Sequence, residues 1–543
     1  MANFGEILQA AGDFGLFQKL LILALGFPNV LLAVSFASVL FVDSDPKRHC
    51  NTDWILAAGP NLTEEEQLNL TVPRELDGSL SRCLMFSPVD WTLDSIRQYG
   101  LNHTTACQDG WVYDQTLYQA TIVTDFNLVC DKAHLAGIAQ TVFMSGILAG
   151  SFIFGPASEP LGRKTLIQAP TCLLMVFTLV SGLSVNLYMY LAAQFMVGVS
   201  IGGYRINASV LGTEWLGITK RSFAPCVNQL LASIGQCATT GLMYGARDWR
   251  LALYILSGPV AVVSIYTWFI PESARWLLTK GRHREAKEWI LKAAKINKRV
   301  VPDNLLESVT IDQAVKREGI KTLFKSPTLR KYILIMSFAW FSTNLGYYSL
   351  SLNVGNFGLN IFLVQLMFGL SQMPAQLLCF CMLEVLGRKK SILCTTITGS
   401  FVCFITLAFS QERSVVIAVL ATVGRFLFTC SSSVFMVYGS ELFPTSVRQQ
   451  AVGLCSIMVR VAGMLSPLLN LLAVHHWTIP IIVFSSLTLV GGALTFLLPE
   501  TRGRELADST EQAEDQRRNM AIMKKISDPN TPEQTSARSS TKL

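Results

Sequence analysis

The sequence predicts an all-α polytopic membrane protein with twelve transmembrane helices in two six-helix pseudo-symmetric halves. Composition is the first reason: of 543 residues, 51% are hydrophobic and 15% are charged, with a mean hydropathy of +0.40, outside the usual range for soluble domains. The second reason is that apolar stretches of about 20 residues, the length that crosses a bilayer, recur twelve times. The third is that short motifs recur at an offset of about 225 to 228 residues, which indicates a duplication.

The predicted spans divide six and six around a polar segment. Pro28 and several small residues favour a broken or bending first helix. The spans cover residues 18–42, 134–157, 165–184, 188–210, 223–246, 250–271, 331–352, 358–383, 391–410, 414–437, 450–473 and 478–498. The predicted organisation is an N-terminal segment 1–17, a first half 18–271 that includes a loop at 43–133, a linker 272–330, a second half 331–499 and a polar, disordered tail 500–543.

Basic residues predict the orientation of the chain. Lys and Arg follow the second, fourth, eighth and tenth spans, and the segment from Glu272 to Lys331 holds fifteen basic residues against seven acidic ones. Under the positive-inside rule these segments and both termini are cytoplasmic, and the first span targets the chain because no removable signal peptide is expected. The same rule accounts for the net charge of +7. Because orientation in the membrane explains the basic surplus, the surplus does not indicate nucleic-acid binding. Membrane lipid is an expected partner and nucleic acid is not.

The loop at 43–133 is then extracellular. It carries three N-x-S/T sequons, at Asn61, Asn69 and Asn102, which an extracellular position makes available for glycosylation. An oxidising compartment also allows disulfides. Four of the thirteen cysteines lie in or at the end of this loop and can form two disulfides in three alternative pairings: Cys50, Cys83, Cys107 and Cys130. The other nine lie in apolar spans without a metal-binding pattern, so no metal site is expected.

Three arginines lie well inside predicted spans: Arg205 in the fourth, Arg425 in the tenth and Arg460 in the eleventh. A charge at this depth usually faces a water-filled cavity or a partner. The alternative is a side chain that reaches the interface or forms a structural ion pair, but Arg460 is too deep in the run 451–472 for easy snorkelling. No Asp or Glu lies at comparable depth. The arginines therefore predict a cavity that favours organic anions, which a guanidinium binds with two parallel hydrogen bonds.

Aromatic side chains are the other candidates for contact with a ligand. An aromatic ring stacks on a planar solute and a phenol offers one hydrogen bond, although packing against lipid or core is the alternative for any single ring. The pair Tyr347 and Tyr348 stands beside Asn344 in a polar stretch, which favours a ligand role. Trp340 and Tyr438 are further candidates.

The recurring motifs predict charged clusters at the cytoplasmic ends of the helices. Glu-x-x-Gly-Arg-Lys follows the second and eighth spans, a Glu and a following Arg end the fourth and tenth, and Pro-Glu-Ser or Pro-Glu-Thr follows the sixth and twelfth. Such clusters favour a latch that joins the halves in one state and releases them in the other. Topology marking with helix capping is the alternative. The candidate latch residues are Glu159, Arg163, Glu214 and Arg221 in the first half, and Glu384, Arg388, Glu441 and Arg448 in the second.

Two cytoplasmic segments carry further signals. Residues 285–298, EAKEWILKAAKINK, place apolar residues at helical spacing, which predicts an amphipathic helix under the bundle. The chain ends in Thr541, Lys542 and Leu543, which match the carboxyl terminus that PDZ domains bind by strand addition. A PDZ scaffold is therefore a candidate partner.

Longer motifs carry a resemblance to a known family. They are CQDGWVYD at 107–114, FNLVCD at 126–131, PESARWLL at 271–278, SELFPTSVRQ at 440–449 and LLPETRG at 497–503. On these motifs the chain resembles, from about Phe4 to Arg504, the major facilitator superfamily and within it the organic anion, cation and carnitine transporter family. GDFGLFQ at 12–18, with EQLNLTVP and CLMF, is most similar to the nicotinate and urate type of organic anion exchanger.

The resemblance implies roles for individual residues. The position of Arg460 is basic in the anion transporters of the family and acidic in the cation transporters, whereas that of Arg425 is basic in both. Tyr347 and Tyr348 align with substrate-lining residues.

Two positions depart from the family pattern. Gln372 and Gln376 stand where the family has an acid and often a Lys or Arg, a pair that can form a local i,i+4 contact. Gln376 is a further candidate for contact with the substrate. Arg205 stands where related anion transporters carry a small polar residue. We expect Arg205 to replace the cation missing at Gln376.

These observations predict a plasma-membrane transporter of small organic anions, such as nicotinate or urate, that works by alternating access. Exchange for a counter-anion is the expected mode, and facilitated diffusion is the alternative that the sequence leaves open. The chain contains no G-x-x-x-x-G-K-[ST] motif for ATP. Its spans contain neither a nucleophile with a base nor a metal cluster, so no enzyme activity and no cofactor is expected. The alternative is a carrier of a zwitterionic or neutral planar solute, carnitine-like or vitamin-like, or of an organic cation. Gln372 and Gln376 favour that alternative.

Overall fold

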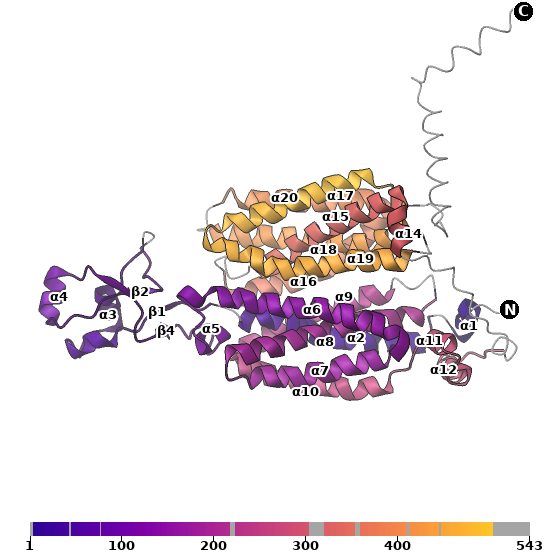
Figure 1. Ribbon diagram of the computed structural model, residues 1–543, viewed down its shortest axis with the longest axis horizontal. Coiled ribbons are helices and arrows are strands. Elements are labelled where there is room, and N and C mark those ends of the chain that lie inside the picture. The colour runs from indigo at the N-terminus through magenta and orange to yellow at the C-terminus, as the bar shows by residue number, and fades with distance from the viewer. Residues whose placement is uncertain are drawn as a thin grey trace, which may run out of the picture.

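In the part of the chain that the structure describes, twelve long helices form two bundles of six that lie one beside the other (Figure 1). The computed structural model describes residues 4–12, 14–42, 45–75, 78–217, 223–302, 320–352, 359–409, 413–444 and 447–502. The first half consists of α2 (Leu16–Val42), α6 (His134–Leu161), α7 (Thr165–Gly182), α8 (Leu187–Glu214), α9 (Phe223–Ala246) and α10 (Trp249–Tyr266). The second consists of α15 (Pro327–Leu352), α16 (Ile361–Val385), α17 (Arg388–Thr406), α18 (Ser414–Leu442), α19 (Arg448–Leu471) and α20 (Thr478–Leu494).

The predicted fold class is confirmed, and all twelve predicted spans coincide with helices. Within the described residues, eight helices are long and apolar enough to cross a membrane by length and composition alone. The other four, α8, α9, α15 and α17, are more polar. Three of these four contribute side chains to the central cavity, which explains their lower hydropathy. Helix α2 continues through Pro28, so the first helix is not broken at this residue.

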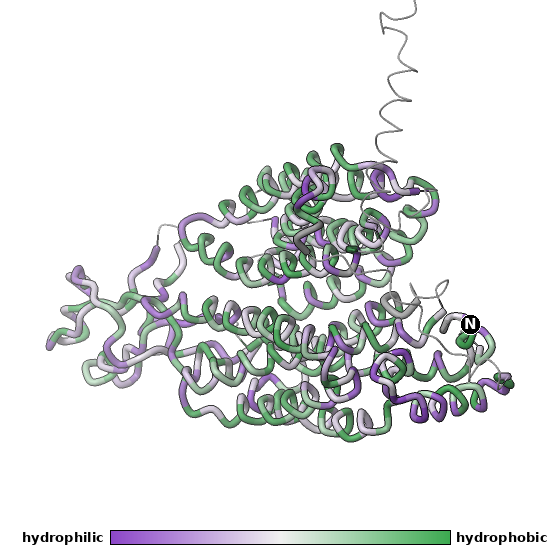
Figure 2. Tube along the Cα trace, turned by 45° about the vertical axis from the view of Figure 1, so that its right-hand side comes forward, coloured by the Kyte–Doolittle hydropathy of each residue, from purple (hydrophilic) through white to green (hydrophobic). Residues whose placement is uncertain are grey.

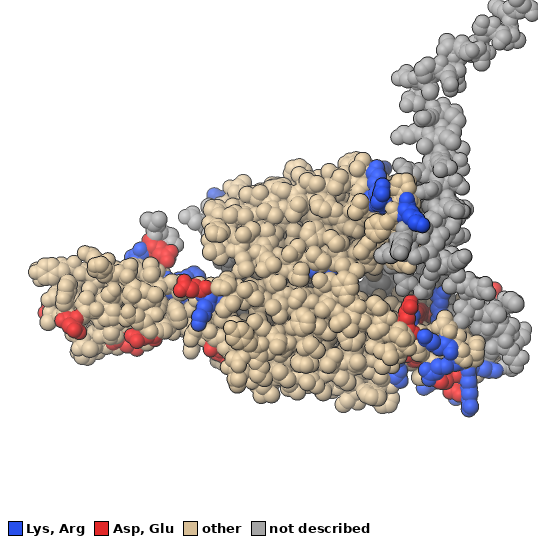
Figure 3. All heavy atoms as spheres, in the orientation of Figure 1, with Lys and Arg blue, Asp and Glu red and all other residues tan. Residues whose placement is uncertain are grey.

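Polar and apolar residues separate along the molecule as a bilayer requires. Hydrophobic residues dominate the two bundles, whereas hydrophilic ones gather on the loop region and around α12 (Figure 2). On the face shown in Figure 3, Lys, Arg, Asp and Glu lie at the two ends, and the surface between them is nearly free of charge. We refer to the two ends as the loop end, where residues 45–133 lie, and the linker end, where α12 lies.

Helices α6 and α8 pack through glycines, which lets the two backbones approach closely. A Cβ added at Gly150 would lie 2.2 Å from the Val199 carbonyl oxygen, and one at Gly198 would lie 2.3 Å from the Phe143 carbonyl oxygen. Any side chain at these positions would force the helices apart, as in other membrane helix pairs that rely on small residues. Close packing of α6 against α8 therefore depends on glycine at both positions.

The loop between α2 and α6 folds into a small unit with two disulfides. Its elements are β1 (Arg48–Cys50), α3 (Glu64–Thr71), β2 (Leu84–Phe86), α4 (Leu93–Tyr99), β3 (Thr104–Ala106), β4 (Trp111–Tyr113) and α5 (Ile122–Asp125). Strand β1 pairs antiparallel with β4, and β2 with β3. Of the three open pairings, the structure forms Cys50–Cys107 and Cys83–Cys130. The unit is joined to the first half where Trp249 Nε1 donates to Asp125 Oδ2, at 3.0 Å.

Short helices cover the linker end. They are α1 (Phe4–Ala11), α11 (Ala274–Thr279), α12 (His283–Ile296) and α14 (Ile320–Lys325). The predicted amphipathic helix is α12, whose Ile290 and Ala293 are buried. Asn297, directly after α12, donates to the Ala11 carbonyl oxygen at 2.8 Å and accepts from the Phe17 backbone N–H at 2.8 Å. The N-terminal segment is therefore hydrogen-bonded to the end of α12.

Candidate functional site

A cavity of about 350 Å³ lies between the two halves. The first half contributes residues of α2, α8 and α9, and the second contributes residues of α15, α16, α18 and α19. All three predicted arginines, Arg205, Arg425 and Arg460, line it. None of the described residues that line it is Asp or Glu. The cavity thus combines positive charge with the absence of acidic side chains that was expected from the sequence.

Arg425 has its guanidinium bound on every side, although its side chain lines the cavity. Its Nε donates to Ser351 Oγ at 2.8 Å, one terminal nitrogen donates to the Phe368 carbonyl oxygen at 2.9 Å, and the other donates to Gln236 Oε1 at 3.1 Å and Tyr347 Oη at 3.0 Å. The residue is only 2% exposed. Arg425 therefore connects α15, α16 and α18 with α9 of the other half.

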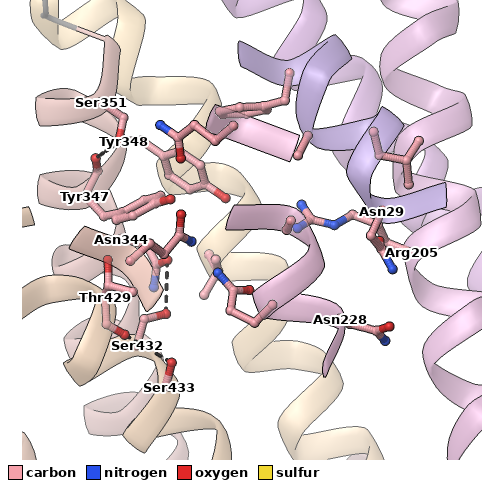
Figure 4. A pocket seen from close by; sticks show the side chains of 18 of the residues that line it. Asn29, Arg205, Asn228, Asn344, Tyr347, Tyr348, Ser351, Thr429, Ser432 and Ser433 are labelled. Atoms are coloured by element: carbon pink, nitrogen blue, oxygen red, sulfur yellow. Dashed lines mark hydrogen bonds between the residues drawn. The ribbon is translucent and has the colours of Figure 1, made fainter. Parts of the chain in front are cut away.

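Arg205 and Arg460 differ from Arg425 in that their donors remain available to a ligand. Neither forms a hydrogen bond or an ion pair with any described residue, and both are partly exposed to the cavity. The two guanidinium groups also interact electrostatically with each other. Arg205 and Asn29 extend into the cavity from the first half, facing Tyr347 and Tyr348 of the second (Figure 4).

The predicted aromatic contacts are largely in place. Tyr347 and Tyr348 both line the cavity, with their ring centroids 5.2 Å apart in an edge-to-face arrangement. Tyr348 also lies 6.2 Å from Phe36 of α2. Trp340 lines the cavity as well, and its indole N–H donates to Ser432 Oγ at 3.2 Å. These rings give the cavity flat walls on which a planar solute can stack.

Two predicted substrate contacts are not part of the cavity wall. Tyr438 is fully buried, and its hydroxyl donates to the Pro499 carbonyl oxygen. Its ring packs into the core at the linker end. The prediction was wrong because the sequence does not show which face of α18 an aromatic residue occupies. Gln376 lies behind the wall and accepts a hydrogen bond from Ser433 Oγ at 3.1 Å. Gln372, one turn earlier in α16, lines the cavity in its place.

Most of the polar wall was not predicted from the sequence. Carboxamide and hydroxyl side chains face the cavity from both halves. Polar residues at one-turn spacing in α9 and α18 are the signal that could have found them. The carboxamides are Asn29, Asn228, Gln229, Gln236, Asn344 and Gln372, and the hydroxyls beyond the tyrosines are Ser209, Ser351, Thr429, Ser432 and Ser433.

Aromatic rings from both halves pack together at the loop end, next to the cavity. Phe362, at the start of α16, stacks on Phe41 of α2 with centroids 5.2 Å apart, and it contacts Tyr118 of the loop and Tyr244 of α9 at 6.0 and 5.6 Å. The cavity wall on α2 reaches Leu40, so these rings lie directly beyond it. We call Phe41, Tyr118, Tyr244 and Phe362 the aromatic seal.

The repeated motifs form two matching charge clusters at the linker end. In the first half, Arg163 pairs with Glu214 at 3.1 Å. In the second half, Arg388 pairs with Glu441 at 2.7 Å. Each pair joins elements of one half, so these two ion pairs do not connect the halves in this structure.

Other predicted latch residues are placed differently. Glu159 and Glu384 have exposed side chains. Arg448 Nε donates to the Phe443 carbonyl oxygen at 3.2 Å, and Glu441 pairs with Arg388. Arg221 lies outside the described residues, as do Thr541, Lys542 and Leu543.

Two acidic residues that were not among the candidates complete the clusters. Glu272 accepts hydrogen bonds from the backbone N–H groups of Arg163 and Lys164 at 3.1 Å. Glu500 does the same for Arg388 and Lys389, at 3.0 and 3.1 Å. Burial raises the pKa of the Glu272 carboxyl above its ordinary value, and the N–H donors oppose that rise. The recurring Pro-Glu-Ser and Pro-Glu-Thr motifs supply these caps.

Comparison with known proteins identifies the family. Residues 87–512 match the family model described as "Sugar (and other) transporter". The chain is 38% identical over 516 residues to human solute carrier family 22 member 13, covering 95% of this chain and 94% of the relative. The chain belongs to solute carrier family 22. It is also 33% identical to human member 14 over 540 residues, covering 96% of this chain and 90% of the relative.

A further relative supports this assignment, and a solved structure shows the same fold. Organic anion transporter 3 of Oryctolagus cuniculus is 32% identical over 521 residues, with 94% of each chain covered. The fold matches the proton:xylose symporter XylE of the major facilitator superfamily, at a TM-score of 0.58 and 14% identity, covering 92% of this chain and 99% of the symporter. The resemblance to this transporter family, inferred from the motifs, is therefore confirmed. The chain is a multi-pass membrane transporter of this superfamily rather than an enzyme.

Proposed function

We propose that this transporter carries small organic anions, aromatic or heterocyclic carboxylates such as nicotinate and urate, across the plasma membrane. The observation that carries the proposal is the charge of the cavity, which three arginines line without any acid among its described lining residues. Unbalanced positive charge away from bulk water attracts anions strongly. Similarity to a relative named organic anion transporter 3 supports the same substrate class.

The rest of the wall supports a flat, hydrogen-bonding substrate. Tyr347, Tyr348 and Trp340 offer ring faces and edges. The carboxamides of Asn29, Gln229 and others present both donors and acceptors. A heterocycle with ring nitrogens or carbonyl groups can form hydrogen bonds with these carboxamides. A purely aliphatic anion leaves the carboxamides of the wall unpaired.

Alternating access with exchange is the proposed mode of transport. The cavity lies between two halves that can rock against each other. Arg205 belongs to the first half and Arg460 to the second, so in the empty carrier like charges oppose each other across the cavity. A bound anion offsets this repulsion. The loaded carrier should therefore reorient more readily than the empty one, which favours exchange against a counter-anion.

Uptake into proteoliposomes tests this proposal. The purified full-length protein would be offered labelled nicotinate, urate, para-aminohippurate, carnitine and tetraethylammonium, with and without an anion preloaded inside. We expect saturable uptake of the anions, acceleration by the preloaded anion, and no uptake of tetraethylammonium. Uptake of the quaternary ammonium in preference to all three anions would refute the proposal.

A neutral or zwitterionic planar substrate is the second candidate. Gln372 lines the cavity and Gln376 lies directly behind it, and the wall is rich in carboxamides. Saturable carnitine uptake in the same assay, with no uptake of the anions, would favour this candidate.

We further propose that both termini face the cytoplasm and that the loop faces outward. Exposed side chains at Asn61, Asn69 and Asn102 support glycosylation there. Two disulfides in the loop support an oxidising surrounding. The terminal residues Thr541, Lys542 and Leu543 remain a proposed PDZ ligand.

A further inference from the structure

The cavity holds two available guanidinium groups where a single carboxylate needs only one. Arg425 uses its donors on Ser351, Phe368, Gln236 and Tyr347. Arg205 and Arg460 form no hydrogen bond or ion pair with any described residue. They are therefore the two cations that a solute in the cavity can reach.

No residue of the wall neutralises these two charges. The described lining residues include no Asp or Glu, and the acid nearest to Arg205 along α8 is Glu214, which pairs with Arg163 at the linker end. A solute with one negative group can form a bidentate contact with one guanidinium. The other guanidinium then remains desolvated and repelled, which costs free energy in a low dielectric.

The two cations also lie on different halves with ring faces between them. Arg205 projects from α8 of the first half, and Arg460 projects from α19 of the second. Tyr348 lines the same cavity as Arg205 and Arg460, and its ring packs against Phe36 of the first half. A flat solute beside Tyr348 can present one negative group to each half.

We propose that the preferred substrates are planar organic dianions and that Arg205 is the residue that recognises the second negative group. The inference rests on the proposed transport of organic anions and narrows it. Arg460 binds one anionic group from the second half, the tyrosines contact the ring, and Arg205 binds the other group from the first half. Charge number, in addition to ring shape, then decides which anions are carried.

Three pyridine probes separate charge from shape. Pyridine-3,5-dicarboxylate carries two charges, its monomethyl ester has nearly the same size with one charge, and nicotinate is the parent monocarboxylate. Competition against labelled nicotinate uptake by the full-length protein in proteoliposomes gives an apparent affinity for each. We expect the dianion to bind at least about tenfold more tightly than its monomethyl ester, the loss typical of one hydrogen-bonded charge.

Substitution of Arg205 then assigns the preference to that residue. In Arg205→Gln we expect the affinity for the dianion to fall about tenfold or more and that for nicotinate to change less than about threefold. Arg205→Lys should retain most of the preference because it keeps the charge. The matched control is Arg284→Gln, which removes a guanidinium from the exposed face of α12 and should change neither affinity.

Each outcome separates this inference from the proposed function. Equal affinity of the wild-type protein for the dianion and its ester overturns the inference without any variant that has to fold. Equal losses for both probes in Arg205→Gln, or sigmoidal nicotinate uptake from two anions sharing the cavity, overturn it as well. Absence of saturable uptake for all three probes, in a sample that is monodisperse and folded, contradicts the proposed function instead.

Discussion

Three intramembrane arginines have different surroundings, and these surroundings decide what each residue does. Arg425 is enclosed by four hydrogen-bonding partners from three other helices and by the rings of Tyr347 and Phe368. Arg205 and Arg460 face the cavity without such partners. The same residue type therefore holds helices together at one position and is available to a ligand at two others.

Replacing Arg425 should affect folding more than ligand choice. In Arg425→Lys, a single ammonium cannot reach the partners that the planar guanidinium reaches, and buried acceptors are left unpaired. We expect the free energy of unfolding in detergent to fall by about 3 kcal/mol, measured by denaturant titration. Arg460→Lys is the matched control and should stay within about 0.5 kcal/mol. Equal stability of the two variants would contradict this assignment.

Replacing Arg460 should have the opposite pattern. Arg460→Gln removes one of the two available cations but breaks no hydrogen bond to a described residue. We expect nicotinate uptake at low concentration to fall about tenfold or more, since a charged hydrogen bond is lost, while the unfolding free energy is unchanged. Uptake kinetics and denaturant titration of the same preparation measure both. A variant with unchanged uptake would remove Arg460 from the binding site.

At the scale of helices, the first half depends on the close approach of α6 and α8. Gly150→Val would place a side chain against the Val199 backbone, and relieving that overlap requires the helices to separate. We expect a loss of about 3 kcal/mol in stability, seen as a lower melting temperature and a reduced monodisperse fraction. Gly155→Val on the same helix is the control, because a Cβ at Gly155 meets nothing within 4 Å. Similar behaviour of both variants would show that the packing is not limiting.

Helix positions were largely predictable, and their polar ends were not. Apolar length predicted twelve spans because a bilayer imposes that length. Helices α8 and α18 continue past the predicted ends at 210 and 437, to Glu214 and Leu442, because polar residues there still complete helical turns outside the apolar stretch. The charge clusters show the same limit. Their motifs were recognised, but pairing of Arg163 with Glu214 depends on where distant helix ends meet.

The positive charge of the cavity was predicted from the sequence, but only some of its lining residues were. Intramembrane arginines are visible in a sequence because charge is rare at that depth. Asn228 and Gln229 were missed because amides are common at helix ends and packing contacts. Tyr438 was misplaced because periodicity in an all-round apolar helix does not distinguish the cavity face from the core face.

At the scale of the whole molecule, the two halves meet through the aromatic seal at the loop end of the cavity. In Phe362→Ala the contacts with Phe41, Tyr118 and Tyr244 are lost. With a cysteine introduced in the cavity as Asn344→Cys, we expect a membrane-impermeant thiol reagent applied to intact cells to label it several-fold faster in the Phe362→Ala background.

Phe401→Ala, which removes an exposed ring from α17, is the control for this experiment and should leave the labelling rate unchanged. Equal rates with and without Phe362 would show that the seal does not limit access. The same experiment reports on orientation, because labelling from outside requires the loop end to be extracellular.

The position of Arg205 and Arg460 on different halves also bears on how the transporter responds to voltage. Both charges stay with the protein throughout the cycle, and each charge that crosses a potential of 100 mV changes its energy by about 2.3 kcal/mol. If rocking of the halves moves them through part of the field, return of the vacant carrier becomes voltage-sensitive. A bound dianion cancels both charges and removes that sensitivity, so currents recorded without substrate would report the movement of the protein itself.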